Sequence, residues 1–237
     1  MSDTPQNDTD RPASFYMTAV FVLPFVVYLV GANLAAWQPQ QFAAGYTVLA
    51  LITSGVLCWS ICAGNVLQPH KHVGAAVAIG FVGIAVWIGL SGLRLEERLA
   101  VWLPTWLQPG ERAGFDPYSE LQSIWACTAF IAVRVFGLAV IVPLAEELFW
   151  RGFLLRWIID EDFEKVSIGQ YSLRSCVTVV LLFTIVHPEW LAAAIYCAML
   201  NALIYWKKDL WCCVVAHGVS NLALAAYVLA TRSWWLW

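Results

Sequence analysis

The sequence predicts an all-α fold, a polytopic membrane helix bundle with seven or eight transmembrane helices. Of its 237 residues, 61% are hydrophobic and 12% are charged, whereas a soluble domain carries about 25% charged residues. Several apolar runs reach the roughly 20 residues that a helix needs to cross a bilayer. Another apolar run, 144–153, contains two adjacent glutamates and an arginine. Charges at membrane depth are costly and usually functional.

Six segments are expected to be spans or parts of spans. The runs without Asp, Glu, Lys or Arg are Phe15–Ala36, Gly45–Leu67, Val73–Leu93 and Leu210–Thr231. Trp190–Trp206 is shorter, but tryptophans bracket it and tryptophan favours the membrane interface. Ser175–His187 is shorter still and ends at Pro188, which marks a break.

The segment Leu121–Ile159 decides the number of spans. As one straight helix it would be about 58 Å long, against a bilayer core of about 30 Å. We prefer a break near Arg134–Gly137, which leaves Val135–Ile158 as a complete span with the glutamates at its centre. The alternative is one long tilted helix that projects into water.

Three regions follow from these patterns. Residues 1–14 are polar and acidic and are predicted to form a disordered tail. Residues 15–120 hold the N-terminal transmembrane helices and a long interfacial loop, in which L93-R-L-E-E-R98 is predicted to be solvated at the membrane edge. Residues 121–237 form the expected catalytic domain. The positive-inside rule places the loops after Arg156 and Trp206 inside, but leaves the position of the N-terminus open.

Composition also bounds the partners. The net charge is −3 and there is no basic block, so nucleic acid is excluded as an expected partner. The seven cysteines lack the spacing of metal ligands and are expected to be buried apolar side chains.

The two adjacent glutamates cannot share one role. Neighbouring residues of a helix point about 100° apart. Glu147 and Arg151 are four residues apart in the favoured acid-first order, so we expect a structural ion pair. Glu146 has Trp150 at the corresponding position and no cation. A carboxylate of this kind in apolar surroundings suits a general base, and we assign Glu146 to that role.

Two histidines lie on other apolar helices. His187 follows Phe183 by one turn, and His217 shares a helix face with Asn221. Measured along the helices from the inner face, Glu146, His217 and His187 lie roughly 15, 11 and 20 Å deep. An imidazole beside a carboxylate can orient water, and imidazole and amide groups can donate hydrogen bonds to an oxyanion. The sequence does not show whether these groups converge laterally.

The motifs E146-E-x-x-x-R151, F183-x-x-x-H187 and H217-x-x-x-N221, in this order on successive hydrophobic helices, resemble those of the CAAX-protease and bacteriocin-processing family (CPBP, or Abi). This family includes the type II CAAX prenyl endopeptidases. The resemblance covers about Val135 to Thr231. It implies an intramembrane endopeptidase in which Glu146 and His187 activate water while His217 and Asn221 stabilise the oxyanion. The tryptophan-rich loop also resembles the CAAX-protease-related proteins that accompany bacterial exosortase systems.

Zinc is the alternative to a metal-free site. Glu146, His187 and His217 could supply three ligands of a catalytic zinc. No H-E-x-x-H motif presets two ligands on one helix, and Glu147 is expected to pair with Arg151. We therefore favour a glutamic-type enzyme without a cofactor.

The sequence thus predicts an integral, multi-pass protein of the bacterial cytoplasmic membrane that hydrolyses a peptide bond in a membrane protein or peptide substrate. The alternative is a non-catalytic membrane partner, or a bacteriocin-immunity-type module, on the same scaffold. The substrate and the oligomeric state remain open.

Overall fold

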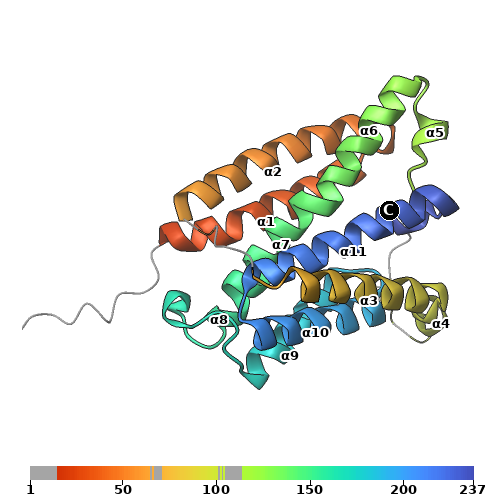
Figure 1. Ribbon diagram of the computed structural model, residues 1–237. Helices are drawn as coiled ribbons and strands as arrows, with labels where there is room; N and C mark the ends of the chain where they lie inside the picture. Colours follow the sequence, from red (N-terminus) through yellow and green to blue (C-terminus); the bar gives the residue numbers. More distant parts are fainter. Residues whose placement is uncertain (1–14, 65, 67–70, 101, 103, 105–113) are drawn as a thin grey trace, which may run out of the picture.

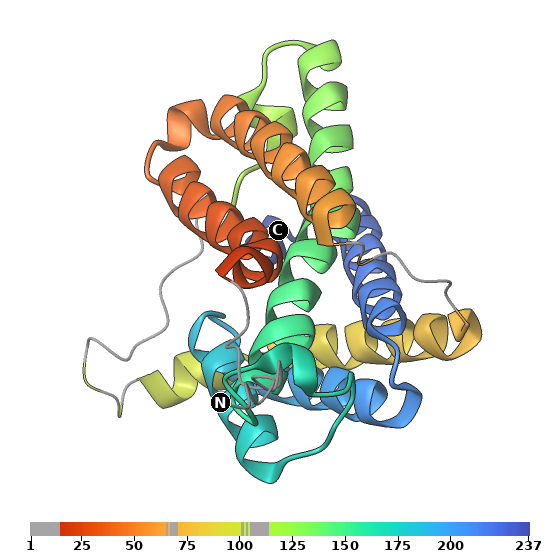
Figure 2. The ribbon, with the colours of Figure 1, turned by 90° about the vertical axis from the view of Figure 1, so that its left-hand side faces the viewer.

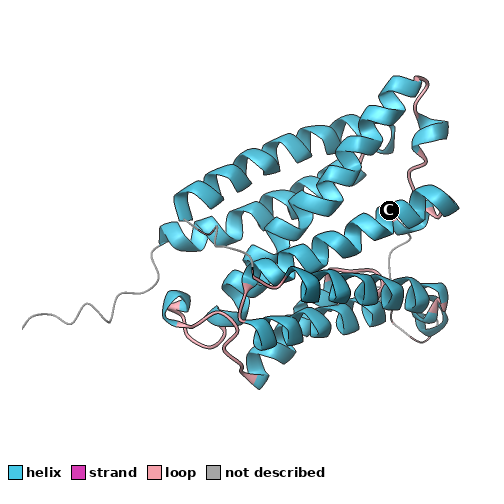
Figure 3. Cartoon of the chain, viewed as in Figure 1, coloured by secondary structure: helices cyan, strands magenta, loops and turns pink. Residues whose placement is uncertain are grey.

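The computed structural model describes residues 15–64, 66, 71–100, 102, 104 and 114–237. Helices dominate this part of the chain, and none of it forms a strand (Figure 3). The predicted all-α fold is therefore confirmed. The predicted disordered tail, residues 1–14, lies outside the described residues, as does the middle of the long loop, residues 105–113.

Six helices in the described residues are long and apolar enough to cross a membrane, which confirms a polytopic helical protein. They are α1 (Phe15–Ala36), α2 (Phe42–Gly64, preceded by the 3-10 turn Pro39–Gln41), α3 (Val73–Gly92), the long helix Ile124–Trp157, α10 (Trp190–Lys207) and α11 (Leu210–Thr231). The apolar helix α9 (Leu173–Ile185) is shorter. The remaining elements are α4 (Leu95–Ala100), α5 (Pro117–Glu120) and the 3-10 turns Phe163–Lys165 and Trp234–Leu236.

The long helix corrects one expectation. The preferred break near Arg134–Gly137 is wrong, because one helix continues over 34 residues, from Ile124 to Trp157. Gly137 has φ −56° and ψ −51°, ordinary helical values, so it does not interrupt the backbone. At 1.5 Å per residue the helix is about 51 Å long, longer than a bilayer core of about 30 Å.

The long helix contains two π-helical segments. It consists of α6 (Ile124–Phe136), a π-helical segment Gly137–Ile141, α7 (Val142–Glu147), a second π-helical segment Leu148–Leu154 and α8 (Leu155–Trp157). Short π segments inside α-helices occur often at functional sites. Here they flank α7, which carries both glutamates.

The other helices pack around this one. Helices α1 and α2 lie together on one side of the long helix, and α3, α9 and α10 lie on the other (Figures 1 and 2). Helix α11 runs between the two groups and contacts α3, α7, α10 and the first π segment. When the shorter α9 is included, successive apolar helices alternate in direction, so α1 begins and α11 ends at opposite ends of the bundle (Figure 1).

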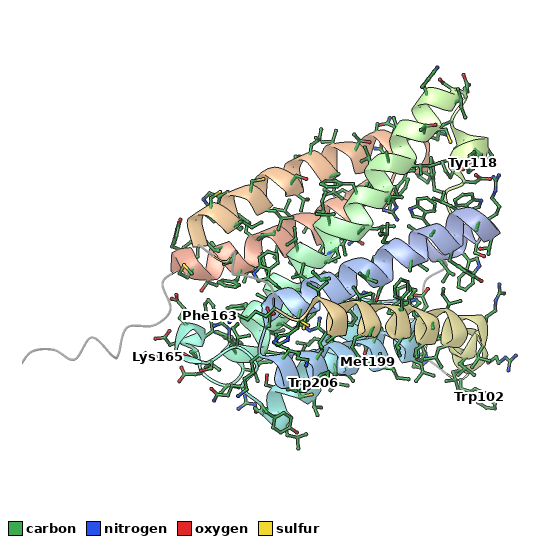
Figure 4. All side chains as sticks on the ribbon, in the orientation of Figure 1. Trp102, Tyr118, Phe163, Lys165, Met199 and Trp206 are labelled. Carbon is green, nitrogen blue, oxygen red and sulfur yellow. The ribbon has the colours of Figure 1, made fainter. Side chains whose placement is uncertain are left out.

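Aromatic and charged side chains mark the two ends. Phe163, Lys165 and Trp206 lie toward the end where α1 begins, whereas Trp102 and Tyr118 lie at the other (Figure 4). Trp102 and Trp206 are 85% and 67% exposed. Exposed aromatic residues near both ends of a bundle are typical of the two membrane interfaces.

Small residues let α11 approach its neighbours closely. A Cβ atom at Gly218 would lie 2.7 Å from the carbonyl oxygen of Ala139 in the first π segment. A Cβ atom at Gly80 in α3 would lie 2.7 Å from the carbonyl oxygen of Ala216. Backbone oxygens cannot rotate away as side chains can, so both positions need glycine for this packing distance.

We predict that Gly218→Ala lowers the stability of the protein by about 1–3 kcal/mol, the usual cost of overpacking. Gly89→Ala is the matched control, because no atom lies within 4 Å of a Cβ built at that helical glycine. Thermal unfolding of the detergent-solubilised variants measures both. Equal melting temperatures for the two variants would contradict the close approach of α11 to the π segment.

Candidate active site

Glu147 is the centre of a buried ionic cluster. Its side chain is fully buried, and its Oε1 accepts a hydrogen bond from Arg151 Nη1 at 3.1 Å, one turn along the same helix. The same oxygen lies 2.8 Å from His217 Nδ1 on α11. The expected Glu147–Arg151 pair therefore forms. The contact with His217 was not expected from the sequence.

Arg151 extends the cluster to α10. Its Nε donates to Asn201 Oδ1 at 3.2 Å, and its Nη2 donates to the carbonyl oxygen of Cys197 at 3.2 Å. Its guanidinium carbon lies 5.5 Å from the centre of the Phe183 ring on α9. A buried ion pair is tolerated only when hydrogen bonds satisfy its remaining donors, and Asn201 and Cys197 provide these bonds.

Glu146 has a different environment. Its side chain is also buried, but within the described part of the chain its Oε2 has no hydrogen-bond partner. The indole nitrogen of Trp150, one turn away, is also buried without a partner among these residues. A buried carboxylate oxygen that no protein group satisfies costs stability and therefore requires an explanation. Glu146 therefore takes no part in the ionic cluster around Glu147.

His187 lies just beyond α9, and its ring is fixed. Its Nδ1 is 2.7 Å from the carbonyl oxygen of Phe183, and its ring stacks on the Phe183 ring at 4.2 Å between centres. The ring of Trp87 on α3 meets it edge-on at 5.9 Å. A carbonyl oxygen can only accept, so Nδ1 carries the proton and Nε2 is the acceptor nitrogen of the neutral ring.

The segment after His187 is tied to α4. Glu96 is buried, and its Oε1 accepts a hydrogen bond from the backbone nitrogen of Leu191, in the first turn of α10, at 3.2 Å. The prediction that L93-R-L-E-E-R98 is solvated is therefore wrong for Glu96. Because Leu191 follows His187 by four residues, Glu96 helps to hold the turn that carries the histidine.

His217 and Asn221 occupy one face of α11, as their spacing predicted. The ring of Tyr196 meets His217 edge-on at 5.7 Å, and the Tyr196 hydroxyl donates to Ser220 Oγ at 2.8 Å. Asn221 Nδ2 donates to the carbonyl oxygen of Leu138 in the first π segment at 2.9 Å. An amide nitrogen has two hydrogens, so Asn221 keeps a second donor.

Aromatic contacts connect the two histidines. Trp87 lies edge-on to His187 at 5.9 Å and to Tyr196 at 5.8 Å, and Tyr196 contacts His217. Neither Trp87 nor Tyr196 was predicted from the sequence to belong to the site. Tyr196 could have been recognised as a candidate, because its hydroxyl is a polar group within an apolar span. Nothing in the sequence distinguished Trp87, because it is one of 14 tryptophans and most were interpreted as interfacial anchors.

The alternative zinc site does not fit this arrangement. No group of three or more His, Cys, Asp and Glu side chains within the described ranges is placed to hold a metal ion. Glu146, His187 and His217 therefore do not form a ligand set, and His217 Nδ1 is directed at Glu147.

Comparison with protein families supports the resemblance seen in the motifs. Residues 124–223 match the family model described as type II CAAX prenyl endopeptidase Rce1-like. The matched range begins with α6 and includes both glutamates, both histidines and Asn221. Comparisons with curated proteins and with solved structures gave no significant match.

We predict that Glu147→Gln destabilises the protein by about 3–5 kcal/mol, because it leaves the buried Arg151 guanidinium without a carboxylate. Glu146→Gln is the matched variant, since it makes the same change at the adjacent buried position and breaks no ion pair found among the described residues. Thermal unfolding in detergent compares them. A Glu147→Gln protein as stable as Glu146→Gln would argue against the ionic cluster as a structural element.

Proposed function

Because residues 124–223 match the family model described as type II CAAX prenyl endopeptidase Rce1-like, we propose that the protein is a glutamic-type intramembrane endopeptidase with Glu146 as its general base. The different environments of the adjacent glutamates carry this proposal. Glu147 is committed to Arg151 and His217. Glu146 is buried beside them, with one oxygen unpartnered among the described groups.

The proposed reaction is hydrolysis of a peptide bond. Glu146 removes a proton from a water molecule whose oxygen attacks the substrate carbonyl carbon, and His187 Nε2 orients that water. The carbonyl oxygen becomes an oxyanion. Asn221 and His217 stabilise it, and the second amide hydrogen of Asn221 is available as a hydrogen-bond donor. The carbon–nitrogen bond then breaks, and Glu146 returns the proton to the leaving amine.

The substrate is proposed to be a membrane protein or membrane-associated peptide, since the catalytic groups lie on membrane-spanning helices. Lys71, Arg156, Lys207 and Lys208 line one pocket, at the ends of α8 and α10 and just before α3. These helix ends lie toward the end of the bundle where α1 begins (Figure 1). By the positive-inside rule this end faces the cytoplasm. We therefore propose a bacterial cytoplasmic-membrane protein with α1 starting inside. A role beside an exosortase system remains a prediction from the tryptophan-rich loop.

Glu146→Gln and His187→Ala are predicted to lower kcat by about 100- to 10,000-fold, the usual contribution of general acid–base groups. Co-purification with Glu146→Gln first identifies a substrate, and cleavage of that substrate by reconstituted protein is then measured. Glu161→Gln, an exposed glutamate outside the cluster, serves as the control with wild-type turnover. Near-normal cleavage by correctly inserted Glu146→Gln would refute this mechanism.

Cleavage is predicted to persist after removal of divalent metal ions with a chelator, because the proposed chemistry uses only side chains. The measurement compares the cleavage rate before and after chelation, with the metal content of the purified protein determined in parallel. Loss of cleavage on chelation and its recovery with zinc would instead support the three-ligand site of Glu146, His187 and His217.

A further inference from the structure

A pocket of about 470 Å³ lies apart from the candidate active site. It is bounded by the ends of α2, α8 and α10 and the beginnings of α3 and α11, which meet at the end of the bundle where α1 begins (Figures 1 and 2). Of its lining residues, Arg156 is ten positions after Glu146 on the long helix, about 15 Å along the axis. The proposed peptidase chemistry does not use this pocket.

The lining of the pocket is strongly basic. The lining residues include four cations, Lys71, Arg156, Lys207 and Lys208, and one carboxylate, Asp209. With His72 neutral, these charged groups sum to +3. Asp209 Oδ1 accepts hydrogen bonds from the backbone nitrogens at the start of α11, where a carboxylate is favoured by the helix dipole. The pocket therefore has an excess of positive charge.

Arg156 is the most informative of these cations. Its side chain is only 9% exposed. Its Nε donates to the carbonyl oxygen of Gly152 at 2.6 Å and its Nη1 to that of Val166 at 3.3 Å, and no ion pair of Arg156 is found in the described ranges. The nearest compensating charge is the exposed carboxylate of Glu164, which acts on Arg156 without forming an ion pair with it among the described residues. A buried cation whose hydrogen bonds go only to neutral carbonyls is incompletely compensated, and an anion in the pocket would supply the missing charge.

Apolar groups complete the lining. Phe21, Ile168 and Trp211 border the pocket, and the Trp211 indole nitrogen donates to the carbonyl oxygen of Val66 at 2.9 Å. The guanidinium of Arg156 lies over the rings of Phe21 and Phe163, at 5.5 and 4.8 Å from their centres. A basic pocket with apolar walls at the end of membrane-spanning helices suits a ligand that has both a phosphate and hydrocarbon chains.

We propose that this pocket binds the phosphate headgroup of an anionic phospholipid from the leaflet at that end of the bundle. Arg156 and Lys208 contact the phosphate, while Phe21 and Trp211 contact the glycerol backbone and the first methylenes. The lipid links the ends of α3, α8, α10 and α11. The distance along the helix from Glu146 favours a lipid over the carboxylate of a bound peptide substrate.

The test is native mass spectrometry of the full chain titrated with phosphatidylglycerol or phosphatidylcholine. We expect phosphatidylglycerol to be retained preferentially, and Lys71→Gln/Lys208→Gln to lower its retention by at least about tenfold. The control Lys165→Gln/Arg174→Gln removes the same charge from exposed positions outside the pocket at the same end of the bundle. Phosphatidylglycerol should also raise the melting temperature of the wild type and of the control more than that of the pocket variant.

Three outcomes would overturn the proposal. Equal retention of the two lipids excludes recognition of the headgroup. If the pocket and control variants lose phosphatidylglycerol retention equally, the binding depends on general surface charge and not on this pocket. Displacement of phosphatidylglycerol by inorganic phosphate, or by a peptide with a free C-terminal carboxylate, would assign the pocket to that ligand. Because all readouts are binding and stability, failure of the peptidase proposal would leave this result unaffected.

Discussion

The Glu147 carboxylate is the group on which the arrangement of the site depends. One of its oxygens contacts both Arg151 on the long helix and His217 on α11. Arg151 in turn contacts Asn201 and Cys197 on α10. Three helices are therefore joined by one buried charge network. Removal of any member leaves another charge or polar group unpaired at low dielectric. Substitutions within the network are therefore expected to destabilise the protein.

This network also explains the use of two adjacent glutamates. A single carboxylate that paired with Arg151 would be held too firmly, and its charge would be too well compensated, for it to act as a base. The 100° between neighbouring helical side chains lets the chain place a second carboxylate beside the network without joining it. Glu147 therefore fixes the geometry, and Glu146 takes its position from the same backbone turn.

The π segments contribute a second constraint. An α-helix that continued regularly through Gly137–Ile141 would pair each carbonyl with the amide four residues ahead. In the observed segment the wider turn changes that pairing, and the carbonyl oxygen of Leu138 accepts from Asn221 of α11. Gly218, one turn before Asn221 along α11, approaches the carbonyl oxygen of Ala139. The irregular turn thus sets how closely α11 approaches and how the amide is oriented.

Local patterns in the sequence were sufficient for part of this arrangement. Hydropathy identified the spans, and the i,i+4 rule identified the Glu147–Arg151 pair, because both depend on neighbouring residues of one helix. The contact between Glu147 and His217 joins residues 70 positions apart, and no single-helix rule contains it. The break expected near Gly137 was wrong because length alone does not interrupt a helix: the backbone keeps helical winding through Gly137 and continues as a π segment.

Glu96 shows why charge at a membrane edge is difficult to interpret from sequence. The L93-R-L-E-E-R98 segment resembles ordinary interfacial charge, yet Glu96 is buried and accepts a hydrogen bond from the first turn of α10. A helix N-terminus in an apolar environment needs acceptors for its unpaired amides, and here the acceptor comes from 95 residues earlier in the chain. Two contacts therefore hold the turn that carries His187. The carbonyl oxygen of Phe183 bonds the His187 ring from within the same chain segment, and Glu96 of α4 bonds the first turn of α10, which follows the histidine. The imidazole is thereby positioned by the N-terminal half of the protein, although the family match begins only at residue 124.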